Sequence, residues 1–452
     1  MADRAAIILA AGQGTRMRSR LPKVLHPVGG RAMLDWSIAL AKDLGCQRII
    51  VVASPGAPEV QAHIRNRLGD DALVLQETAL GTGHAVRCAE AALADFEGDV
   101  VVLYGDTPLI PPSVVEQLFE RIGGAPVLGV LGFHAADPGS YGRLVTGSDG
   151  ALHAIVEAKE ASPEELAITF CNSGVLAARS ELLFELLAAI TNENAKGEYY
   201  LTDTVGLARA RGAECCAVSC DETDVLGVNS RVELAQAETA FQHRRREQAL
   251  RDGVTMVAPE TVFFSYDTEI LPDTSIEPNV VFGQGVKIGA NVRIGAFSHI
   301  QQAVISENCE VGPFARLRPG SYMEAGSKIG NFVEMKNTHL GRGAKANHLA
   351  YLGDGEIGAE ANIGAGTIFC NYDGFRKHRT EVGAGAFVGS NNSLVAPVRI
   401  GDGAMTGSGS VITKDVEADA LALGRAQQMI KPGWATRFRD AMAAIKAARS
   451  KR

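Results

Sequence analysis

The sequence has no hydrophobic run approaching the roughly 18 residues that a membrane-spanning helix needs. We also expect no cleavable signal, because the amino terminus leads directly into an apolar stretch at residues 5–9 that is typical of a strand. We therefore expect a cytoplasmic protein without a membrane span.

Positive charge is scarce, since 44 Lys and Arg face 52 Asp and Glu, and the net charge is -8. This balance argues against a surface that binds polyanions, so we expect no nucleic acid partner. The chain also lacks any Cys-x-x-Cys pair, and most of its eight cysteines lie in apolar stretches. The pattern favours buried free thiols over disulfides or a zinc site.

The length of 452 residues exceeds what one hydrophobic core usually organises, which predicts two or three domains. Up to about residue 225, apolar runs alternate with amphipathic stretches. The predicted strands are residues 5–9, 48–52, 72–75 and 99–103, and the predicted helices are residues 32–44, 60–68 and 83–93. Alternation of this kind predicts a Rossmann-like α/β domain with a mostly parallel sheet, which binds ligands at the carboxyl ends of its strands.

In the second half, large and mostly apolar residues recur about every six positions, in a series that is disturbed between Met335 and Ile357 and resumes again at Val382 after a spacing of thirteen. They are Ile276, Phe282, Ile288, Ile294, Ile300, Ile305, Val311, Leu317, Met323, Ile329, Met335, Ile357, Ile363, Phe369, Val382, Val388, Leu394, Ile400, Thr406 and Ile412. A unit of six residues cannot bury its own apolar side and must stack on its neighbours. Three units make the sides of a triangle, with glycine at the tight corners. The period therefore predicts a left-handed parallel β-helix, whereas ordinary strands between glycine turns would not need so many positions in phase.

A polar helix connects the two halves. Ser230 and Glu233 form a capping-box pattern at its start, and the polar stretch runs to about Arg251. We expect the α/β domain at residues 1–229, a linker helix at 230–251 and a β-helix domain at 252–452 that closes with a short helix.

A phosphate-binding loop follows the first predicted strand. Small residues and glycines occupy positions 9–14, and Arg16 and Lys23 follow. Such a loop lets backbone N–H groups approach phosphate oxygens while the cations supply charge, which suits a nucleoside triphosphate. Met17 stands where the dinucleotide fingerprint needs glycine, and no Gly-Lys-Ser/Thr follows as a P-loop would require.

With this loop the chain resembles the sugar nucleotidyltransferases, which join a nucleoside triphosphate to a sugar phosphate. Together with the repeats, nearly the whole chain except its carboxyl-terminal tail resembles the bifunctional N-acetylglucosamine-1-phosphate uridyltransferase and glucosamine-1-phosphate acetyltransferase family. The motifs that carry the resemblance are Gln76, 80–85, 104–106, 141–143, Glu157, 172–174, 197–200 and 227–229.

The resemblance implies a uridyl-transfer site in the first half. Its residues for UTP and UDP-N-acetylglucosamine are Leu9, Ala10, Ala11, Gly12, Arg16, Lys23, Gln76, Gly81, Thr82, Asp106, Gly142, Glu157, Asn172 and Asn229. Gln76, Gly81 and Thr82 are expected to contact uracil, and Gly142, Glu157 and Asn172 the N-acetylglucosamine. Asp106 and Asn229 are expected to hold Mg²⁺. The attacking sugar-phosphate oxygen is already ionised, so catalysis is expected from positioning and from charge neutralisation by Arg16, Lys23 and Mg²⁺.

The second half interrupts its repeats with charged clusters, which stacking alone does not require. Acetyl transfer to an amine needs a base that removes a proton, and histidine has a suitable pKa. By resemblance His348 is that base and Glu334 orients its ring. The residues expected to bind glucosamine-1-phosphate are Arg318, Lys336, Tyr351 and Asn362.

Acetyl-coenzyme A is the expected acyl donor. The resemblance assigns it Ala365, Asn371, Tyr372, Ser390, Ser408 and Arg425, and residues 371–378 read as a loop that projects from the coil. Flat triangular faces favour packing against copies of the same chain, so we expect a homotrimer with acetyl-transfer sites between subunits.

Two other functions are compatible with the domain pattern. A nucleotidyltransferase could use the β-helix only for oligomerisation or allosteric control, but that protein would not need Arg318, Lys336 and His348. A scaffold or regulatory subunit would not need the glycine-rich loop, Lys23 or Asp106. The leading hypothesis is the bifunctional enzyme.

Overall fold

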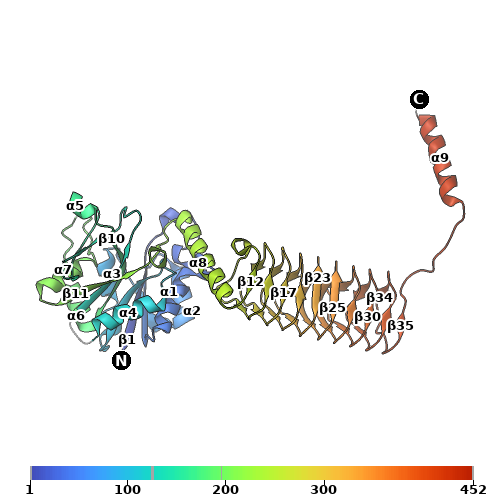
Figure 1. Cartoon of the computed structure of the whole chain (residues 1–452), viewed down its shortest axis with the longest axis horizontal. Helices are drawn as coiled ribbons and strands as arrows, with labels where there is room; N and C mark the ends of the chain where they lie inside the picture. Colours follow the sequence, from blue (N-terminus) through green and yellow to red (C-terminus); the bar gives the residue numbers. More distant parts are fainter. Residues whose placement is uncertain (1–2, 124–126, 195, 450–452) are drawn as a thin grey trace. The chain divides into compact units, whose positions relative to one another are not determined.

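The computed structural model describes residues 3–123, 127–194 and 196–449, and it divides into two compact units (Figure 1). The first unit comprises Met1–Gln248 with Phe264–Tyr266, and the second comprises Ala249–Phe263 with Asp267–Arg452. Most of the helix expected to be a linker thus lies in the first unit.

The first unit is a sheet covered by helices on both faces. The strand order is β11-β7-β10-β6-β1-β4-β5, with the hairpin β8–β9 attached to β10. The strands are β1 Arg4–Ala10, β4 Arg48–Ala53, β5 Leu73–Leu75, β6 Asp99–Tyr104, β7 Val127–His134, β8 Arg143–Thr146, β9 Leu152–Val156, β10 Phe170–Arg179 and β11 Glu214–Cys220, and a separate pair is β2 Pro27–Val28 with β3 Arg31–Ala32. The predicted mostly parallel sheet is confirmed, although β10 runs antiparallel to both β6 and β7.

The helices of the first unit include the ones predicted at 32–44, 60–68 and 230–251, each within two residues of its predicted bounds. They are α1 Met33–Asp43, α2 Pro58–Leu68, α3 Thr82–Cys88, α4 Pro112–Ile122, α5 Pro163–Leu166, α6 Ser180–Ala189, α7 Asp203–Ala210 and α8 Arg231–Arg251. Only the helix predicted for residues 83–93 differs, because α3 ends at Cys88 and a 3-10 turn at Ala91–Leu93 follows. The capping box of α8 is confirmed: the Ser230 N–H donates to Glu233 at 2.7 Å, and the Glu233 N–H donates to Ser230 Oγ at 3.4 Å.

Alternation along β1 explains why the sheet is buried on both faces. Ile7 packs into one hydrophobic cluster and Ile8 into the other, because successive side chains of a strand point to opposite faces. Both side chains are fully buried. Because both faces of the sheet are covered, the polar loops gather at the carboxyl ends of its strands.

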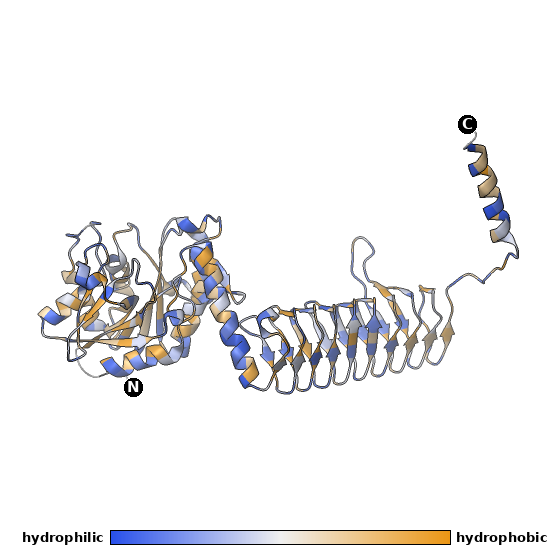
Figure 2. Ribbon diagram, turned by 45° about the horizontal axis from the view of Figure 1, so that its top comes forward, coloured by the Kyte–Doolittle hydropathy of each residue, from blue (hydrophilic) through white to orange (hydrophobic). Residues whose placement is uncertain are grey.

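The second unit is the predicted left-handed parallel β-helix. Its first side is the sheet of β12 Thr255–Met256, β14 Ser275–Ile276, β17 Arg293–Ile294, β20 Glu310–Val311, β23 Lys328–Asn331, β25 Lys345–His348, β27 Asn362–Ile363, β30 Phe387–Val388, β33 Met405–Thr406 and β35 Leu421–Ala422. All its pairs are parallel. Polar and apolar residues alternate along the coils (Figure 2), and most strands present an apolar residue to the interior.

The second and third sides form one larger sheet, because β24 Glu334–Leu340 and β26 Tyr351–Ile357 run around the corner between them. The other strands of the second side are β15 Val281–Phe282, β18 His299–Ile300, β21 Arg316–Leu317, β28 Ile368–Cys370, β31 Ser393–Val395 and β34 Val411–Ile412. Those of the third side are β13 Glu269–Ile270, β16 Lys287–Ile288, β19 Ala303–Ile305, β22 Ser321–Met323, β29 Thr380–Val382 and β32 Val398–Ile400. A carboxyl-terminal helix, α9 Trp434–Arg449, follows the last coil.

The repeat positions are buried throughout, including Thr406, which is 2% exposed. Between Met335 and Ile357, where the six-residue period is lost, the chain still forms coils, and Leu340, Ala346 and Leu352 are buried there. Strand pairing matches Met323 to Leu340 and Leu340 to Ile357. These coils are shorter than the preceding one, which breaks the six-residue count without breaking the fold.

All eight cysteines are free thiols, as predicted, but only Cys171, Cys215 and Cys309 are buried. Within the described part of the chain, no helix is both long and apolar enough to cross a bilayer.

Candidate functional site

A cavity of about 330 Å³ opens where β1 ends. Its lining includes nine of the predicted nucleotide residues: Leu9, Ala10, Ala11, Gly12, Lys23, Gln76, Gly81, Thr82 and Asp106. The loop after β1, the turn before α3 and the end of β6 meet here because parallel strands bring their carboxyl ends to one edge. The cavity is therefore at the position expected for a ligand of this fold.

Lys23 crosses the base of the cavity and connects two loops distant in sequence. Its Nζ lies 2.5 Å from Asp106 Oδ2 and 2.9 Å from Asn229 Oδ1. The side chain of Lys23 is 9% exposed, so this ion pair is shielded from water. Gly14 has φ 62°, and a Cβ there would lie 2.6 Å from the Cβ of Lys23. Glycine is required because the loop passes so close to the lysine.

Asp106 and Asn229 fit a hard divalent cation. Their side-chain oxygens converge on one cation, the Lys23 ammonium, and Mg²⁺ prefers oxygen ligands of this kind. Over residues 3–123, 127–194 and 196–449, no group of three or more His, Cys, Asp and Glu side chains could hold a metal by itself. A metal at Asp106 and Asn229 would consequently need oxygens from a bound phosphate or water.

The turn before α3 is held by the segment that follows residue 198. Tyr199 N–H donates to Leu80 O at 2.8 Å, and Gly83 N–H donates to Tyr199 O at 2.8 Å. Gly81 has φ 106°, and a Cβ there would lie 2.6 Å from Tyr199 O. The backbone of Tyr199 thus passes too close to Gly81 for a side chain to fit, which explains the glycine. Gly81 also lines the cavity.

A second cavity of about 120 Å³ adjoins the first and shares Thr82 and Tyr104 with it. Glu157 and Asn172, both predicted to contact the sugar, line it. Gly142 is not in the lining, but its carbonyl accepts the Asn172 N–H at 2.8 Å. Burial raises the pKa of Tyr104, and the carboxylates of Asp106 and Glu157 raise it further, so its phenol stays protonated.

Arg16, which was predicted to bind the nucleotide, lies outside this cavity. It lies in the 3-10 turn Thr15–Met17, whose Met17 is buried while Arg16 is exposed to solvent and absent from the cavity lining. Sequence reasoning also missed several lining residues, among them Tyr104, Glu198 and Thr202. Tyr104 and Glu198 lie in motifs that carried the family resemblance, and that signal could have found them.

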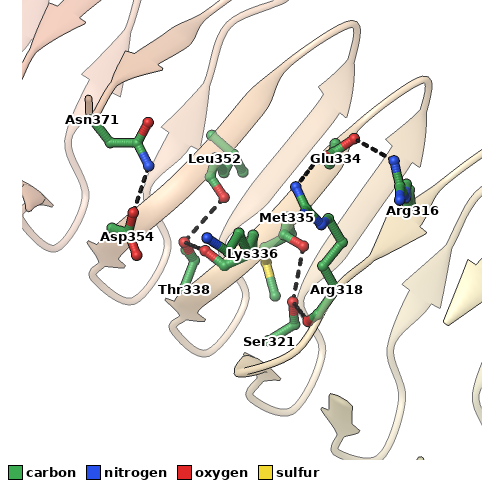
Figure 3. Close-up of polar contacts among 10 residues, drawn as sticks. All are labelled: Arg316, Arg318, Ser321, Glu334, Met335, Lys336, Thr338, Leu352, Asp354 and Asn371. Atoms are coloured by element: carbon green, nitrogen blue, oxygen red, sulfur yellow. Dashed lines mark hydrogen bonds and ion pairs between the residues drawn. The ribbon is translucent and has the colours of Figure 1, made fainter. Parts of the chain in front are cut away.

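In the second unit, a cationic cluster occupies the second side (Figure 3). Arg318 Nη1 lies 2.8 Å from Glu334 Oε1, and Arg316 Nη1 lies 3.4 Å from Glu334 Oε2. Lys377 lies beside Lys336 and lowers the pKa of that ammonium, with burial and Arg318 acting in the same direction. The cluster suits an anion such as a sugar phosphate. Lys377, from the projecting loop, was missed as a site residue.

Asp354 organises the end of this cluster. Its Oδ1 accepts from Asn337 Nδ2 at 2.8 Å, and its Oδ2 accepts from Asn371 Nδ2 at 2.5 Å. Burial opposes ionisation of Asp354, but these hydrogen bonds and the nearby Lys336 lower its pKa overall. A Cβ on Gly353 would lie 2.5 Å from Tyr351 Oη. Glycine thus leaves room for the tyrosine that was predicted to contact the sugar.

His348 lies around the corner, at the end of the first side. Its Nδ1 is 2.5 Å from Asn331 Oδ1, and both residues line an exposed cavity of about 690 Å³. The prediction that Glu334 orients this ring differs from the contacts in the chain, because Glu334 binds Arg316 and Arg318 on the second side. An amide, Asn331, is the ring's partner instead.

Residues predicted for acetyl-coenzyme A continue from His348 along the same corner. Successive coils are joined by hydrogen bonds from Gly366 N–H to His348 O (3.3 Å), Asn391 N–H to Ala365 O (2.7 Å) and Gly409 N–H to Ser390 O (2.8 Å). His348, Ala365, Ser390 and Ser408 therefore form one row. An elongated ligand could follow this row to His348.

The remaining predicted residues are more scattered. Asn362 lies on the first side, in register with Lys345. Asn371 is buried, whereas Tyr372 is exposed in the projecting loop and Arg425 is exposed after the last coil. The loop is braced by Asp373, which accepts from Phe375 N–H, Arg376 N–H and His378 Nε2.

The two units thus define a nucleotidyltransferase domain followed by a hexapeptide-repeat transferase domain. Residues 6–206 match the MobA-like NTP transferase domain, and residues 267–302 and 379–414 match the bacterial transferase hexapeptide repeats. The protein named bifunctional protein GlmU from Hyphomonas neptunium is 62% identical over 448 residues, which cover 99% of this chain and 97% of that protein. The GlmU proteins of Ruegeria sp. and Sphingopyxis alaskensis are 54% and 52% identical, with 99% of each chain covered. The chain belongs to the bifunctional GlmU family.

Proposed function

We propose that the chain transfers an acetyl group from acetyl-coenzyme A to the amine of glucosamine-1-phosphate and then transfers UMP from UTP to the resulting N-acetylglucosamine-1-phosphate. The products are UDP-N-acetylglucosamine, a precursor for cell-envelope polysaccharides, and pyrophosphate. The observation that carries the proposal is the presence of two chemically different clusters in separate units of one chain, each at the residues that family membership predicts.

In the first unit, the residues act by positioning and by charge. The loop after β1 approaches the triphosphate with backbone N–H groups, and Lys23 supplies a shielded positive charge. Asp106 and Asn229 would hold Mg²⁺, which supplies charge neutralisation for the phosphates when bound. Glu157 and Asn172 orient the sugar. The attacking phosphate oxygen is already ionised, so no residue has to remove a proton from it.

In the second unit, His348 removes a proton from the sugar amine as the amine attacks the thioester carbonyl, and the coenzyme thiolate leaves. Asn331 Oδ1 accepts a hydrogen bond from His348 Nδ1, which leaves Nε2 as the basic atom. Arg318 and Lys336 bind the sugar phosphate through their fixed charge. The row from Ala365 to Ser408 supports the acyl donor.

A homotrimer in the cytoplasm belongs to the same proposal. His348 and the cavity beside it lie on the first side of the coil, whereas Arg318 and Lys336 lie on the second side. His348 of one copy would lie beside Arg318 and Lys336 of another copy if the first side of the one packed against the second side of the other.

Product analysis tests the whole proposal. The protein is mixed with glucosamine-1-phosphate, acetyl-coenzyme A, UTP and Mg²⁺, and UDP-N-acetylglucosamine, free coenzyme A and pyrophosphate are expected in equal amounts. Without acetyl-coenzyme A, supplied N-acetylglucosamine-1-phosphate should still be uridylylated, whereas glucosamine-1-phosphate should not. Uridylylation without acetyl transfer would contradict the proposal and would favour a nucleotidyltransferase that uses its β-helix only for oligomerisation or allosteric control.

A further inference from the structure

Gln76 presents its side-chain amide to the nucleotide cavity in a defined orientation. It follows β5, its backbone N–H donates to Ala53 O at 2.9 Å, and it is 7% exposed. Its Nε2 donates to Gly81 O at 3.1 Å and lies 3.1 Å from His84 Nδ1. The amide is therefore held from two directions, by the turn before α3 and by the first turns of α3 itself.

The hydrogen-bond partners of the Gln76 amide determine which of its two terminal atoms is the nitrogen and which is the oxygen. A backbone carbonyl can only accept a hydrogen bond, so the atom of Gln76 beside Gly81 O must be the nitrogen. The second hydrogen of that nitrogen points to His84 Nδ1, which must then carry a lone pair, with the imidazole hydrogen on Nε2. Burial lowers the pKa of His84, and the nearby Arg87 lowers it further, which favours this neutral form.

His84 is itself fixed in place. It lies on α3 against the Tyr199 ring, with ring centroids 6.3 Å apart, and Cys88 Sγ lies 3.9 Å from the same Nδ1. A thiol is a weak donor and leaves the amide of Gln76 as the stronger partner. The ring thus serves as a fixed acceptor behind the cavity wall.

With both amide hydrogens engaged inside the protein, Oε1 is the polar atom that Gln76 offers to a ligand. Uracil carries a hydrogen on N3, which this oxygen can accept, whereas N3 of cytosine carries only a lone pair. Turning the amide over to suit cytosine would place Oε1 against Gly81 O and leave buried groups unpaired. A site built to accept a hydrogen bond discriminates strongly against an analogue that cannot donate one.

We propose that His84 is a positioning residue that holds the Gln76 amide with its oxygen toward the nucleobase, so that the first unit selects uracil nucleotides over cytosine nucleotides. This inference rests on the proposed function, in which Gln76 contacts the base of UTP. His84 acts only through Gln76.

The test compares UTP with CTP in the full-length protein, with N-acetylglucosamine-1-phosphate and Mg²⁺ present. His84→Phe keeps a ring but removes the acceptor, and we expect the ratio of kcat/KM for UTP to that for CTP to fall about tenfold, the effect of losing one hydrogen bond of ordinary strength. His84→Asn places an amide oxygen near the position of Nδ1 and should retain most of the selectivity. An unchanged ratio in His84→Phe, or an equal loss in His84→Asn, would overturn the proposal.

A double-mutant cycle separates positioning from general damage. In a Gln76→Ala background the His84→Phe substitution should no longer change the UTP-to-CTP ratio, because the group it positions is gone. A further fall in the ratio in that background would contradict the inference even if His84→Phe alone lowers stability. Wild-type protein that fails to consume UTP would refute the proposed function itself, whereas active wild type with no coupling between the two residues would refute only the role of His84.

Discussion

At the level of single residues, the nucleotide site depends on one partly buried ion pair, in which Lys23 contacts both Asp106 and Asn229. Asp106 faces Lys23 at 2.5 Å, and Asn229 completes the contact from the start of α8. Removing one member of a buried pair leaves the other charge uncompensated. The acetyl-transfer cluster shares none of these residues, so the two activities should respond separately to substitution.

Replacing Asp106 by Ala should abolish uridyl transfer and spare acetyl transfer. The substitution removes the carboxylate of the proposed Mg²⁺ site and leaves Lys23 without its partner, which should lower the uridyl-transfer rate about a thousandfold or more. Separate assays of pyrophosphate and free coenzyme A, made on one preparation, measure both activities. Parallel loss of both in a folded protein would argue against two independent sites.

Replacing His348 by Ala should have the reverse effect. Without a base, acetyl transfer should fall about a hundred- to ten-thousand-fold, because that is the usual contribution of proton removal by a positioned side chain. Uridylylation of supplied N-acetylglucosamine-1-phosphate should continue at the wild-type rate. His378, which contacts Asp373 in the projecting loop, offers a matched control. The His378→Ala variant keeps His348 as the base, so its acetyl-transfer rate should not show the loss expected for His348→Ala.

At the scale of elements, the site is shaped by turns that only glycine permits. Gly81 combines φ 106° with backbone atoms of Tyr199 that would lie 2.6 and 2.9 Å from a Cβ. The turn connects β5 to α3 and also forms the cavity wall beside Gln76. Local strain there should disturb nucleotide binding before it disturbs the fold.

Gly81→Ala should therefore lower the uridyl-transfer rate and destabilise the first unit by about 1–3 kcal/mol, since neither the conformation nor the space suits a Cβ. Gly206→Ala is the matched control, because Gly206 lies within α7 with no atom within 4 Å of the added Cβ. In a helix this change should be neutral or stabilise by up to about 1 kcal/mol. Thermal unfolding with both activity assays measures the difference, and equal behaviour of the two variants would contradict the account of the turn.

At the scale of the whole molecule, the acetyl-transfer residues are distributed over two sides of the triangular coil. His348 ends β25 on the first side, and Lys336 lies in β24 on the second. Leu349, with φ 53°, turns the corner between them. A site that combines both groups is therefore expected between copies.

Mixed oligomers should recover activity that neither parent has. His348→Ala and Lys336→Ala are each expected to be inactive in acetyl transfer, but co-expression should restore activity at about a quarter of the sites if each site takes its histidine and its lysine from different copies. Sedimentation should show trimers for both variants and for the mixture. Trimeric mixtures without recovered activity would place both groups in the same copy.

From the sequence alone, both domain classes and many residues of the candidate nucleotide cavity could be predicted. The period of six identified the buried residue of most sides, because inward orientation depends only on local spacing. Shorter coils obscured the period between Met335 and Ile357, and the projecting loop shifted it between Phe369 and Val382. The glycine-rich loop and the family motifs indicated nine residues that line one cavity.

Which side chains from distant segments meet became clear only from the folded chain. It paired His348 with Asn331 instead of Glu334, turned Arg16 to solvent and placed Lys23 between Asp106 and Asn229. It also brought His84 behind Gln76. The contacts of His348 and Lys23 arise from the stacking of coils and the convergence of strand ends, so no spacing within a single segment encodes them.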